Sequence, residues 1–530
     1  MSNEFRDLVR SSSRSTQDAT SVARAISTPA SGAVPADDGF WVAVLPFKYG
    51  GSNSDLTALA DGLTEDIITG MSRFPYLKVI ARSSTSRFAN PTIDVRTAAK
   101  ELSARHVMEG NLRQAGTRLR IAVQLVDAIT GAHLWAETYE RGFQPEPVFE
   151  LQDELVPRIV STASDTHGVL PHSMSEMLRD KDPGDLTPYE AVLRSFAYFH
   201  RICPGEHAAM RDALELAVEQ APGYALAWAM LAILQREEYA HSFNAKPDPL
   251  GRAFASARRA VECAPSNHMA HHALAGALFY RGEIQAFHGT AERALALNPM
   301  DGFTSGYLGL LTVYSGEWER GCALAQRARS LNPSHPGWFW FADFFTAFHH
   351  ADYLRALEFA LKLNMPRFWR AHFALAATYG QLGEPEKAQK ALQGLLSLGP
   401  EFGAITRQEC ETYWEPDLAG KLLEGLRKAG LEIPKENESA VPAIDTSLPA
   451  AMSGSGAART DEGFRVAVLP FKFTGDAKEL KALADGVSEE IVTGLSRFSY
   501  LRVVARGSTA KYSSESGDVR ATHSIRGGLA

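Results

Sequence analysis

The sequence is poor in cysteine, with only Cys203, Cys263, Cys322 and Cys410 among its 530 residues. These four residues lie far apart and form no C-x-x-C motif. This argues against a disulfide framework and against a cysteine-ligated zinc site. Few and widely separated cysteines are typical of proteins in a reducing compartment, so we expect a cytoplasmic protein.

Long apolar runs are also missing. No stretch approaches the ~18 consecutive apolar residues that a membrane-spanning helix needs, and we therefore predict no membrane insertion. Residues 1–38 are rich in Ser, Ala and Thr and contain no apolar core of the kind found in signal peptides. This composition predicts a disordered N-terminal arm.

Positive charge is not in excess, because 54 Lys and Arg residues stand against 62 Asp and Glu residues and give a formal net charge of -8. A protein that binds nucleic acid generally needs a basic face to neutralise the phosphates. We therefore expect no nucleic-acid partner.

Common catalytic and cofactor motifs are absent from the sequence: G-x-x-x-x-G-K-[ST], G-x-G-x-x-G after a strand, G-x-S-x-G and H-E-x-x-H. His268 and His272 have the i, i+4 spacing of metal ligands, but no nearby carboxylate or cysteine accompanies them, which favours a surface or groove role. Asp61, Glu65 and Asp66 cluster at a predicted helix start, where acidic side chains favourably oppose the helix dipole. We predict a non-catalytic protein without metal or cofactor.

Residues 39–165 carry the pattern of a mixed α/β domain. The nearly continuous apolar run of residues 40–47 is typical of a buried strand. Around residues 118–127, apolar side chains alternate with polar or small ones, as in a strand with one buried face. The predicted elements are strand 40–47, helix 56–74, strand 77–81, helix 95–104, strands 106–113, 118–127 and 133–139, and a connecting helix 149–163. This order predicts an α+β domain, a mixed sheet with helices on one face.

Strand patterns disappear over residues 186–431, where only helical patterns with short breaks occur. Pro265, Pro299 and Pro333 are spaced 34 residues apart, and Gly282 and Gly316 lie midway between them. Glycine permits the tight turn between two antiparallel helices, and proline ends the second helix of each pair. The pattern predicts an all-α region of about six helical hairpins, with a generic helical bundle as the alternative.

A partial repeat of the first domain occupies the C-terminal part of the sequence. Residues 432–462 have the Pro-, Gly- and Ser-containing composition of a linker. From Phe464 the sequence repeats the first domain at a constant offset without gaps, and the match ends at Arg520. We predict a truncated second copy over 463–520 and a tail over 521–530. The half-copy could dock on the first copy, in cis or by self-association in trans, or be the remnant of a disrupted reading frame.

Both main regions resemble known families. The 34-residue period, with Leu308, Gly309, Gly316 and Ala328 at signature positions, resembles the tetratricopeptide repeat (TPR). The first domain resembles the TolB amino-terminal-like domain on the segments 42–47, 60–68, 77–82, 109–113 and 124–137. That domain precedes TPRs in bacterial regulators of the adenylate cyclase-associated and CadC types. The resemblance implies a TPR superhelix in a regulatory or scaffolding part, here without a cyclase or winged-helix output domain.

In the TPR family the first helix of each hairpin lines a concave groove. Carried over by position, the resemblance places eight residues on that groove: Arg236, His272, Phe279, Tyr280, Phe303, Tyr314, Arg370 and Phe373. An aromatic surface with a few cations suits an extended peptide or an amphipathic helix, although several of these aromatic side chains could instead belong to the core. We predict a protein–protein interaction scaffold with an unidentified protein or peptide partner. The alternative is the ligand-sensing regulatory part of a bacterial signalling system, with the small ligand bound in the α/β domain.

Overall fold

The computed structural model of the protein describes residues 40–89, 94–142, 148–200, 202–241, 243–399, 414–432, 464–468, 486–487, 490–495 and 501–504. The predicted arm over 1–38 and tail over 521–530 lie outside these residues. So does almost all of the predicted linker over 432–462. Those assignments, and the domain boundaries in general, stay predictions.

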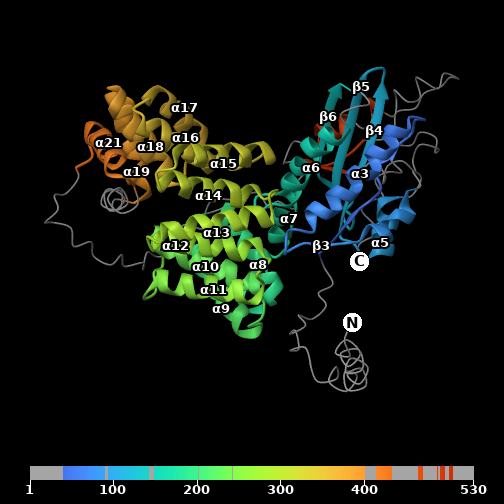
Figure 1. The fold of residues 1–530 in the computed structure, drawn as a ribbon, viewed down its shortest axis with the longest axis horizontal. Helices are drawn as coiled ribbons and strands as arrows, with labels where there is room; N and C mark the ends of the chain where they lie inside the picture. Colours follow the sequence, from blue (N-terminus) through green and yellow to red (C-terminus); the bar gives the residue numbers. More distant parts are fainter. Residues whose placement is uncertain are drawn as a thin grey trace, which may run out of the picture.

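The N-terminal part is built around a mixed sheet (Figure 1). Its first six strands are β1 (Trp41–Val44), β2 (Lys48–Tyr49), β3 (Lys78–Val79), β4 (His106–Ala115), β5 (Arg118–Asp127) and β6 (Ala132–Gly142). Strand β1 pairs in parallel with both β3 and β4, whereas β4, β5 and β6 form an antiparallel meander. The predicted order of strands and helices is confirmed, with three short additions: strand β2, helix α4 (Arg82–Thr85) and the 3-10 turn η1 (Ser86–Phe88).

Helices cover both faces of this sheet, so the prediction of helices on one face is wrong. Successive side chains of a strand point to opposite faces, and both faces of β1 are apolar. Val42 and Val44 pack in the core with α3 (Ser54–Met71) and α6 (Val148–Ser164). Ala43 packs in a second cluster with α5 (Val95–Leu102) on the opposite face. A strand that is apolar on both faces has to be covered on both faces, which is why helices lie on each side of the sheet.

From α8 onward the described chain forms stacked helical hairpins, as the proline and glycine spacing predicts (Figure 1). The pairs are α8 (Pro188–His200) with α9 (Pro204–Gln220), α10 (Ala225–His241) with α11 (Pro249–Cys263), α12 (His268–Tyr280) with α13 (Ile284–Leu297), α14 (Gly302–Tyr314) with α15 (Trp318–Leu331), α16 (Phe341–His349) with α17 (Tyr353–Leu363), and α18 (Trp369–Leu382) with α19 (Pro385–Leu398). A further helix, α21 (Pro416–Lys428), packs on α18. Gly282, Gly316 and Gly383 have positive φ at the turns inside three of these hairpins, where glycine is tolerated without strain.

The α/β part and the helical array share one continuous apolar core. Helix α7 (Val169–Met177) connects α6 to the array, and α6 also packs on α15. At the junction the Tyr76 hydroxyl donates to the Ser164 carbonyl over 2.5 Å, and the Tyr189 hydroxyl donates to the Tyr76 carbonyl over 2.9 Å. The α/β part is therefore fixed against the array through buried contacts.

Asp165, at the end of α6, is the most unusual group of this junction because its carboxylate is fully buried. It accepts hydrogen bonds from the Asn332 amide at 3.3 Å and from the Ser161 hydroxyl at 3.1 Å. Burial, and next the negative charge of Asp301, raise the pKa of Asp165 from 3.8 to about 7. The folded protein thus favours the protonated carboxyl at this position.

We expect the free energy of unfolding to fall as the pH rises from about 4 to about 7, because the folded state resists ionisation of Asp165 while the unfolded state does not. Asp165→Asn should flatten this dependence. Between pH 5 and pH 8, the free energy of unfolding of the wild type should fall by roughly 3 kcal/mol more than that of the variant. Urea unfolding at the two pH values measures the effect. Asp180→Asn, at an exposed position, is the control and should keep the wild-type slope. Equal slopes for Asp165→Asn and wild type would contradict the assignment.

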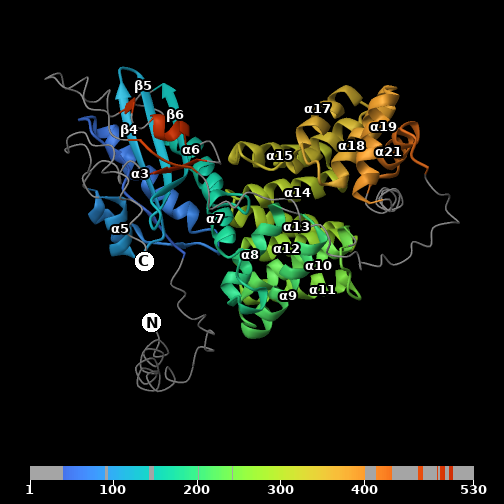
Figure 2. The same cartoon turned by 180° about the vertical axis from the view of Figure 1, so that it is seen from behind.

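Two more strands lie at the edge of the sheet, β7 (Phe464–Ala467) and β8 (Leu501–Val504) (Figure 2). Strand β8 pairs with β6 at Ala132, and β7 pairs in parallel with β8, so the sheet order is β3-β1-β4-β5-β6-β8-β7. The chain that follows the helical array thus returns to the N-terminal sheet.

Candidate ligand pocket

A pocket of about 670 Å³ of empty space, its opening included, lies within the helical array. Its walls come mainly from the first helices of successive hairpins, and from the 3-10 turn η3 (Gly337–Trp340). The lining residues are Tyr198, Phe199, Ile202, Arg236, Glu237, His241, Tyr280, Phe303, Tyr307, Leu310, Leu311, Tyr314, Trp338, Phe341, Phe368 and Arg370. The first helices of the hairpins therefore enclose an aromatic pocket.

Five of the eight residues predicted for the groove line this pocket: Arg236, Tyr280, Phe303, Tyr314 and Arg370. The other three lie in the core. His272 stacks on Phe303 with ring centroids 4.9 Å apart, Phe279 packs edge-on against Phe287, and Phe373 stacks on Trp414. All three are buried and lie outside the pocket lining.

Arg236 is the central cation of the pocket, and only 1% of it is exposed. Its Nη2 donates to the neighbouring Glu237 at 2.5 Å, and its guanidinium lies 4.3 Å from the ring centre of Tyr307. Its Nε and Nη1 have no hydrogen-bond partner in the described part of the chain. Gly276 makes room for the guanidinium, since a Cβ there would lie 2.6 Å from Nη1.

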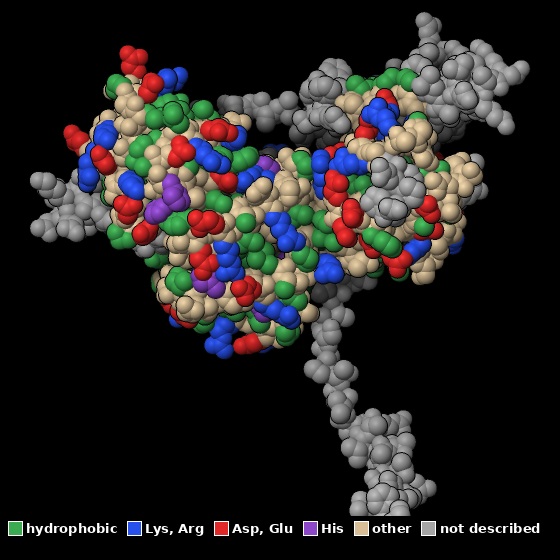
Figure 3. Space-filling view, turned by 45° about the horizontal axis from the view of Figure 1, so that its top comes forward, with side chains coloured by type: hydrophobic (Ala, Val, Ile, Leu, Met, Phe, Trp, Pro, Cys, Tyr) green, Lys and Arg blue, Asp and Glu red, His purple; other side chains and the backbone are tan. Residues whose placement is uncertain are grey.

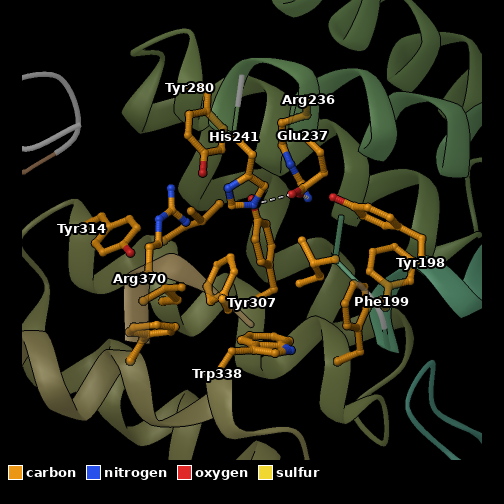
Figure 4. Close-up of a pocket in the computed structure, with 16 residues that line it drawn as sticks. Tyr198, Phe199, Arg236, Glu237, His241, Tyr280, Tyr307, Tyr314, Trp338 and Arg370 are labelled. Carbon is orange, nitrogen blue, oxygen red and sulfur yellow. Dashed lines mark hydrogen bonds and ion pairs between the residues drawn. The ribbon is translucent and has the colours of Figure 1, made fainter. Parts of the chain in front are cut away.

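Glu237 is held between two partners, Arg236 and His241, whose Nε2 lies 2.8 Å from the Glu237 carboxylate (Figure 4). Burial alone would raise the pKa of Glu237, but Arg236 and His241 hold it well below its usual value. Burial alone would likewise lower the pKa of Arg236, but Tyr307 and Glu237 hold it above its usual value. Both groups therefore stay charged inside the array.

A second guanidinium, that of Arg370, enters the pocket near Tyr280 and Tyr314 (Figure 4). Its Nη2 donates to the Ala240 carbonyl over 3.2 Å, and the guanidinium lies 5.3 Å from the ring centre of Trp369. Besides His241, the charged lining residues are two arginines and one glutamate, so the lining has one more cationic than anionic side chain.

The remaining walls are mostly aromatic. Phe199 and Phe303 pack with ring centroids 5.1 Å apart, and Trp338 lies edge-on to Phe303 at 6.2 Å. The Tyr198 hydroxyl is buried and has no hydrogen-bond partner within the described ranges. Flat apolar surfaces with a few polar groups between them are the usual lining of a small-molecule site.

Sequence reasoning missed several lining residues, including Tyr198, Trp338 and Phe341. Tyr198 belongs to α8, in the first helix pair, where the repeat pattern of the sequence is weak. Trp338 lies in a 3-10 turn, which the TPR sequence pattern does not predict. Glu237 and His241 could have been found, because they lie one and five residues after Arg236 on the same helix, α10.

Two other groups of polar residues are accounted for by internal pairing. His268 contacts Asp301 at 3.0 Å rather than forming a metal site with His272. Asp61 and Glu65 lie well inside α3, whose N-cap is Asn53, and both form ion pairs with Arg82. The placement of these acidic residues at a helix start is therefore wrong.

Across the residues that the structure describes, no cluster of three or more His, Cys, Asp or Glu side chains could hold a metal ion. None of the described helices combines the length and the apolar character needed to cross a bilayer. On the face shown in Figure 3, basic and acidic side chains are interspersed over the surface. Cytoplasmic location and the absence of a cofactor stay predictions.

Comparison with known sequences gives a match to a family model and a match to a curated protein. The second domain of HilA/YgeH-like transcriptional regulators matches residues 38–158. "Putative adenylate cyclase 3" of Rhizobium meliloti (strain 1021) is 35% identical over 240 residues, which are 45% of this chain and 40% of that protein. The chain thus spans less than half the length of this curated relative. The finer TolB-like and CadC-type assignments stay predictions.

Solved structures similar to this chain include helical-repeat proteins. A tetratricopeptide repeat protein from Parabacteroides merdae is 15% identical, with a TM-score of 0.29, over 46% of this chain and 98% of that one. The human IFIT1 dimer with PPP-AAAA is 16% identical, with a TM-score of 0.37, over 53% of this chain and 72% of that one. These TM-scores are low, and the helical-repeat architecture of this chain is shown by its own successive helix pairs.

Proposed function

We propose that the helical array is the binding part of a regulatory protein, and that its pocket takes a small aromatic monoanion such as a ring-bearing carboxylate. The observation that carries this proposal is the pair of unpartnered, buried N–H groups of Arg236 in an aromatic-walled pocket. The alternative predicted from the sequence also senses a ligand but places it in the α/β domain, whereas this pocket lies in the helical array.

The unpartnered donors of Arg236 favour a ligand with acceptor oxygens. A buried N–H without a partner costs about 1–3 kcal/mol, which a ligand oxygen would recover. Guanidinium groups present planar pairs of donors that match a carboxylate. The excess of one cationic side chain in the lining favours a ligand with one negative charge, and rings such as Phe199 and Trp338 favour a flat apolar body beside it.

A regulatory role is supported by the two sequence matches, which are named as a transcriptional regulator domain and as an adenylate cyclase. In this proposal the chain supplies the ligand-sensing part, and the pocket does no chemistry. The prediction that the chain is non-catalytic remains to be tested by an assay of nucleotide turnover.

A thermal-shift screen of the full chain tests the ligand class. Benzoate-type carboxylates of one to three rings are compared with their neutral amides, which keep the shape and remove the charge. At a hundredfold excess over Kd, binding stabilises the folded state by about 2.7 kcal/mol, so a carboxylate that binds should raise the Tm of a chain of this size by about 2–3 °C. We expect the matching amide to leave the Tm unchanged. A panel without any carboxylate-specific shift would contradict the proposal.

The protein-scaffold function is the second candidate, favoured by the half-buried Tyr280 and Tyr314 among the lining residues. A partner protein could insert one acidic or aromatic side chain between these rings, which are residue types common at interface hot spots. Copurification of a partner that a pocket-binding carboxylate displaces would favour this candidate.

A further inference from the structure

The ligand pocket has two sides of different chemistry, which lie opposite each other in Figure 4. Arg370 enters from one side, and Tyr198 enters from the other. The Tyr198 hydroxyl is directed toward Arg236 and Glu237. A pocket whose two sides differ in this way can select the direction in which a ligand binds as well as its charge.

The Tyr198 hydroxyl is a hydrogen-bonding group that the described part of the chain leaves unused. Tyr198 is fully buried, and its hydroxyl has no partner among the described residues. Its ring is held edge-on between Phe199 and His207, with ring centroids 5.5 Å and 5.8 Å away. Burial, and next the negative charge of Glu237, raise the pKa of Tyr198 well above its usual value. The hydroxyl therefore stays protonated, and it can both donate and accept a hydrogen bond.

Arg236 and Glu237 complete a polar side that suits a hydroxyl better than a carboxylate. Arg236 supplies the unpartnered Nε and Nη1 donors, and Glu237 supplies an accepting carboxylate. A ligand hydroxyl can accept from a guanidinium and donate to a carboxylate at the same time. A ligand carboxylate in the same place would instead be repelled by the negative charge of Glu237.

The Arg370 side suits the carboxylate. The Arg370 guanidinium donates to the Ala240 carbonyl, which is a neutral acceptor. A ligand carboxylate beside this guanidinium would form a charge-assisted hydrogen bond, which is stronger than a hydrogen bond between neutral groups. In Figure 4, Tyr307 and Trp338 lie between the two sides of the pocket. A flat ring packed against them can therefore connect a carboxylate on one side to a hydroxyl on the other.

We propose that the ligand is a phenolic carboxylate, with its carboxylate at Arg370 and a hydroxyl at the opposite end of the ring bonded to Tyr198. This ligand belongs to the aromatic monoanions of the proposed function, on which the assignment rests, and the new element is the hydroxyl. Tyr198 then determines specificity. An acid without the hydroxyl would bury the Tyr198 hydroxyl and the Arg236 donors without a partner, which a site built for a hydroxyl penalises.

Calorimetric titration of the full chain with matched acids tests the position of the hydroxyl. In two series, built on benzoate and on cinnamate, the para-hydroxy acid is compared with the ortho-hydroxy acid and with the unsubstituted parent acid. We expect the para-hydroxy acid of at least one series to bind roughly ten times more tightly than its parent. The ortho-hydroxy acid carries its hydroxyl on the carboxylate side of the ring and should bind like the parent.

Tyr198→Phe assigns the preference to one residue, because it removes a single oxygen and keeps the ring. We expect the preference for the para-hydroxy acid to fall roughly fivefold, while the Kd of the parent acid stays unchanged. Tyr353→Phe on α17, outside the pocket lining, is the matched control and should keep the wild-type preference. The Tm of Tyr198→Phe should not fall, since the lost hydroxyl bonds to none of the described residues. A lower Tm would count against the proposal, because it would mean that the protein itself uses this hydroxyl.

The titrations distinguish failure of this proposal from failure of the proposed function. If no acid of either series binds, the proposed function is wrong and the phenolic ligand is wrong with it. If the parent acids bind but the para-hydroxyl brings no gain in affinity, only the phenolic ligand is overturned. A gain in affinity that survives Tyr198→Phe would likewise overturn the role of Tyr198 while leaving the carboxylate site intact.

Discussion

Arg236→Met is expected to lower the free energy of unfolding by about 3–5 kcal/mol. The substitution leaves the buried carboxylate of Glu237 with His241 as its remaining partner. Removing one member of a buried ion pair is costly because the other charge stays away from water without compensation. Urea unfolding followed by circular dichroism measures the loss.

The double variant Arg236→Met/Glu237→Leu provides the matched control, since it removes both charges and fills the site with apolar atoms. We expect it to recover most of the stability that the single variant loses, because apolar replacement of a whole buried pair is often neutral or stabilising. A double variant as unstable as Arg236→Met would mean that the loss arises from packing of the arginine side chain.

Gly425→Ala is expected to destabilise the protein by about 3 kcal/mol, because overpacking at a tight contact typically costs 1–3 kcal/mol and here the obstacle is backbone. A Cβ at Gly425 of α21 would lie 2.3 Å from the Ala377 carbonyl oxygen of α18. A Cβ at Gly380 of α18 would lie 1.9 Å from the Gly425 oxygen. The two helices thus approach so closely that neither position has room for a methyl group.

Gly420→Ala in the same helix is the comparison, because a Cβ there would have no atom within 4 Å. Alanine is the better helix former by about 1 kcal/mol, so this variant should be more stable than wild type. Thermal unfolding of the two variants should shift the Tm in opposite directions. A shift in the same direction would contradict the close packing of α18 on α21.

The helical hairpins could be predicted from the sequence because glycine and proline determine turns and helix ends through the local backbone conformation. Gly282 and Gly316 adopt the positive φ of a tight turn, and each lies between two helices of one hairpin. The antiparallel meander was predictable for a similar reason, since the alternation along β5 alone defines its buried face.

The closure of the array could not be predicted from the sequence. The repeat pattern predicts which helix of each hairpin lines the groove. The shape of the pocket depends on how successive hairpins pack, which the pattern does not give. Phe279 and Phe373 are on the expected helices, yet each is buried against other aromatic rings. Trp338 closes the pocket from a 3-10 turn, for which a helical period carries no information.

The half-copy posed a different problem. The repeat of the first domain can be recognised in the sequence from Phe464 onward. The sequence alone leaves three alternatives open: docking in cis, docking in trans and a disrupted reading frame. The choice depends on the β6 edge, which is distant in sequence and meets β8 only through tertiary structure.

The most direct test of the central claim is a calorimetric titration of the full chain with an aromatic carboxylate, in wild type, Arg370→Met and Arg367→Met. Arg370 lines the pocket, whereas Arg367 is exposed three residues earlier. A hydrogen bond to a charged group contributes about 1.5–3 kcal/mol. We predict that Arg370→Met raises the Kd at least tenfold while Arg367→Met leaves it unchanged. Equal affinities in all three proteins would contradict a binding site in this pocket.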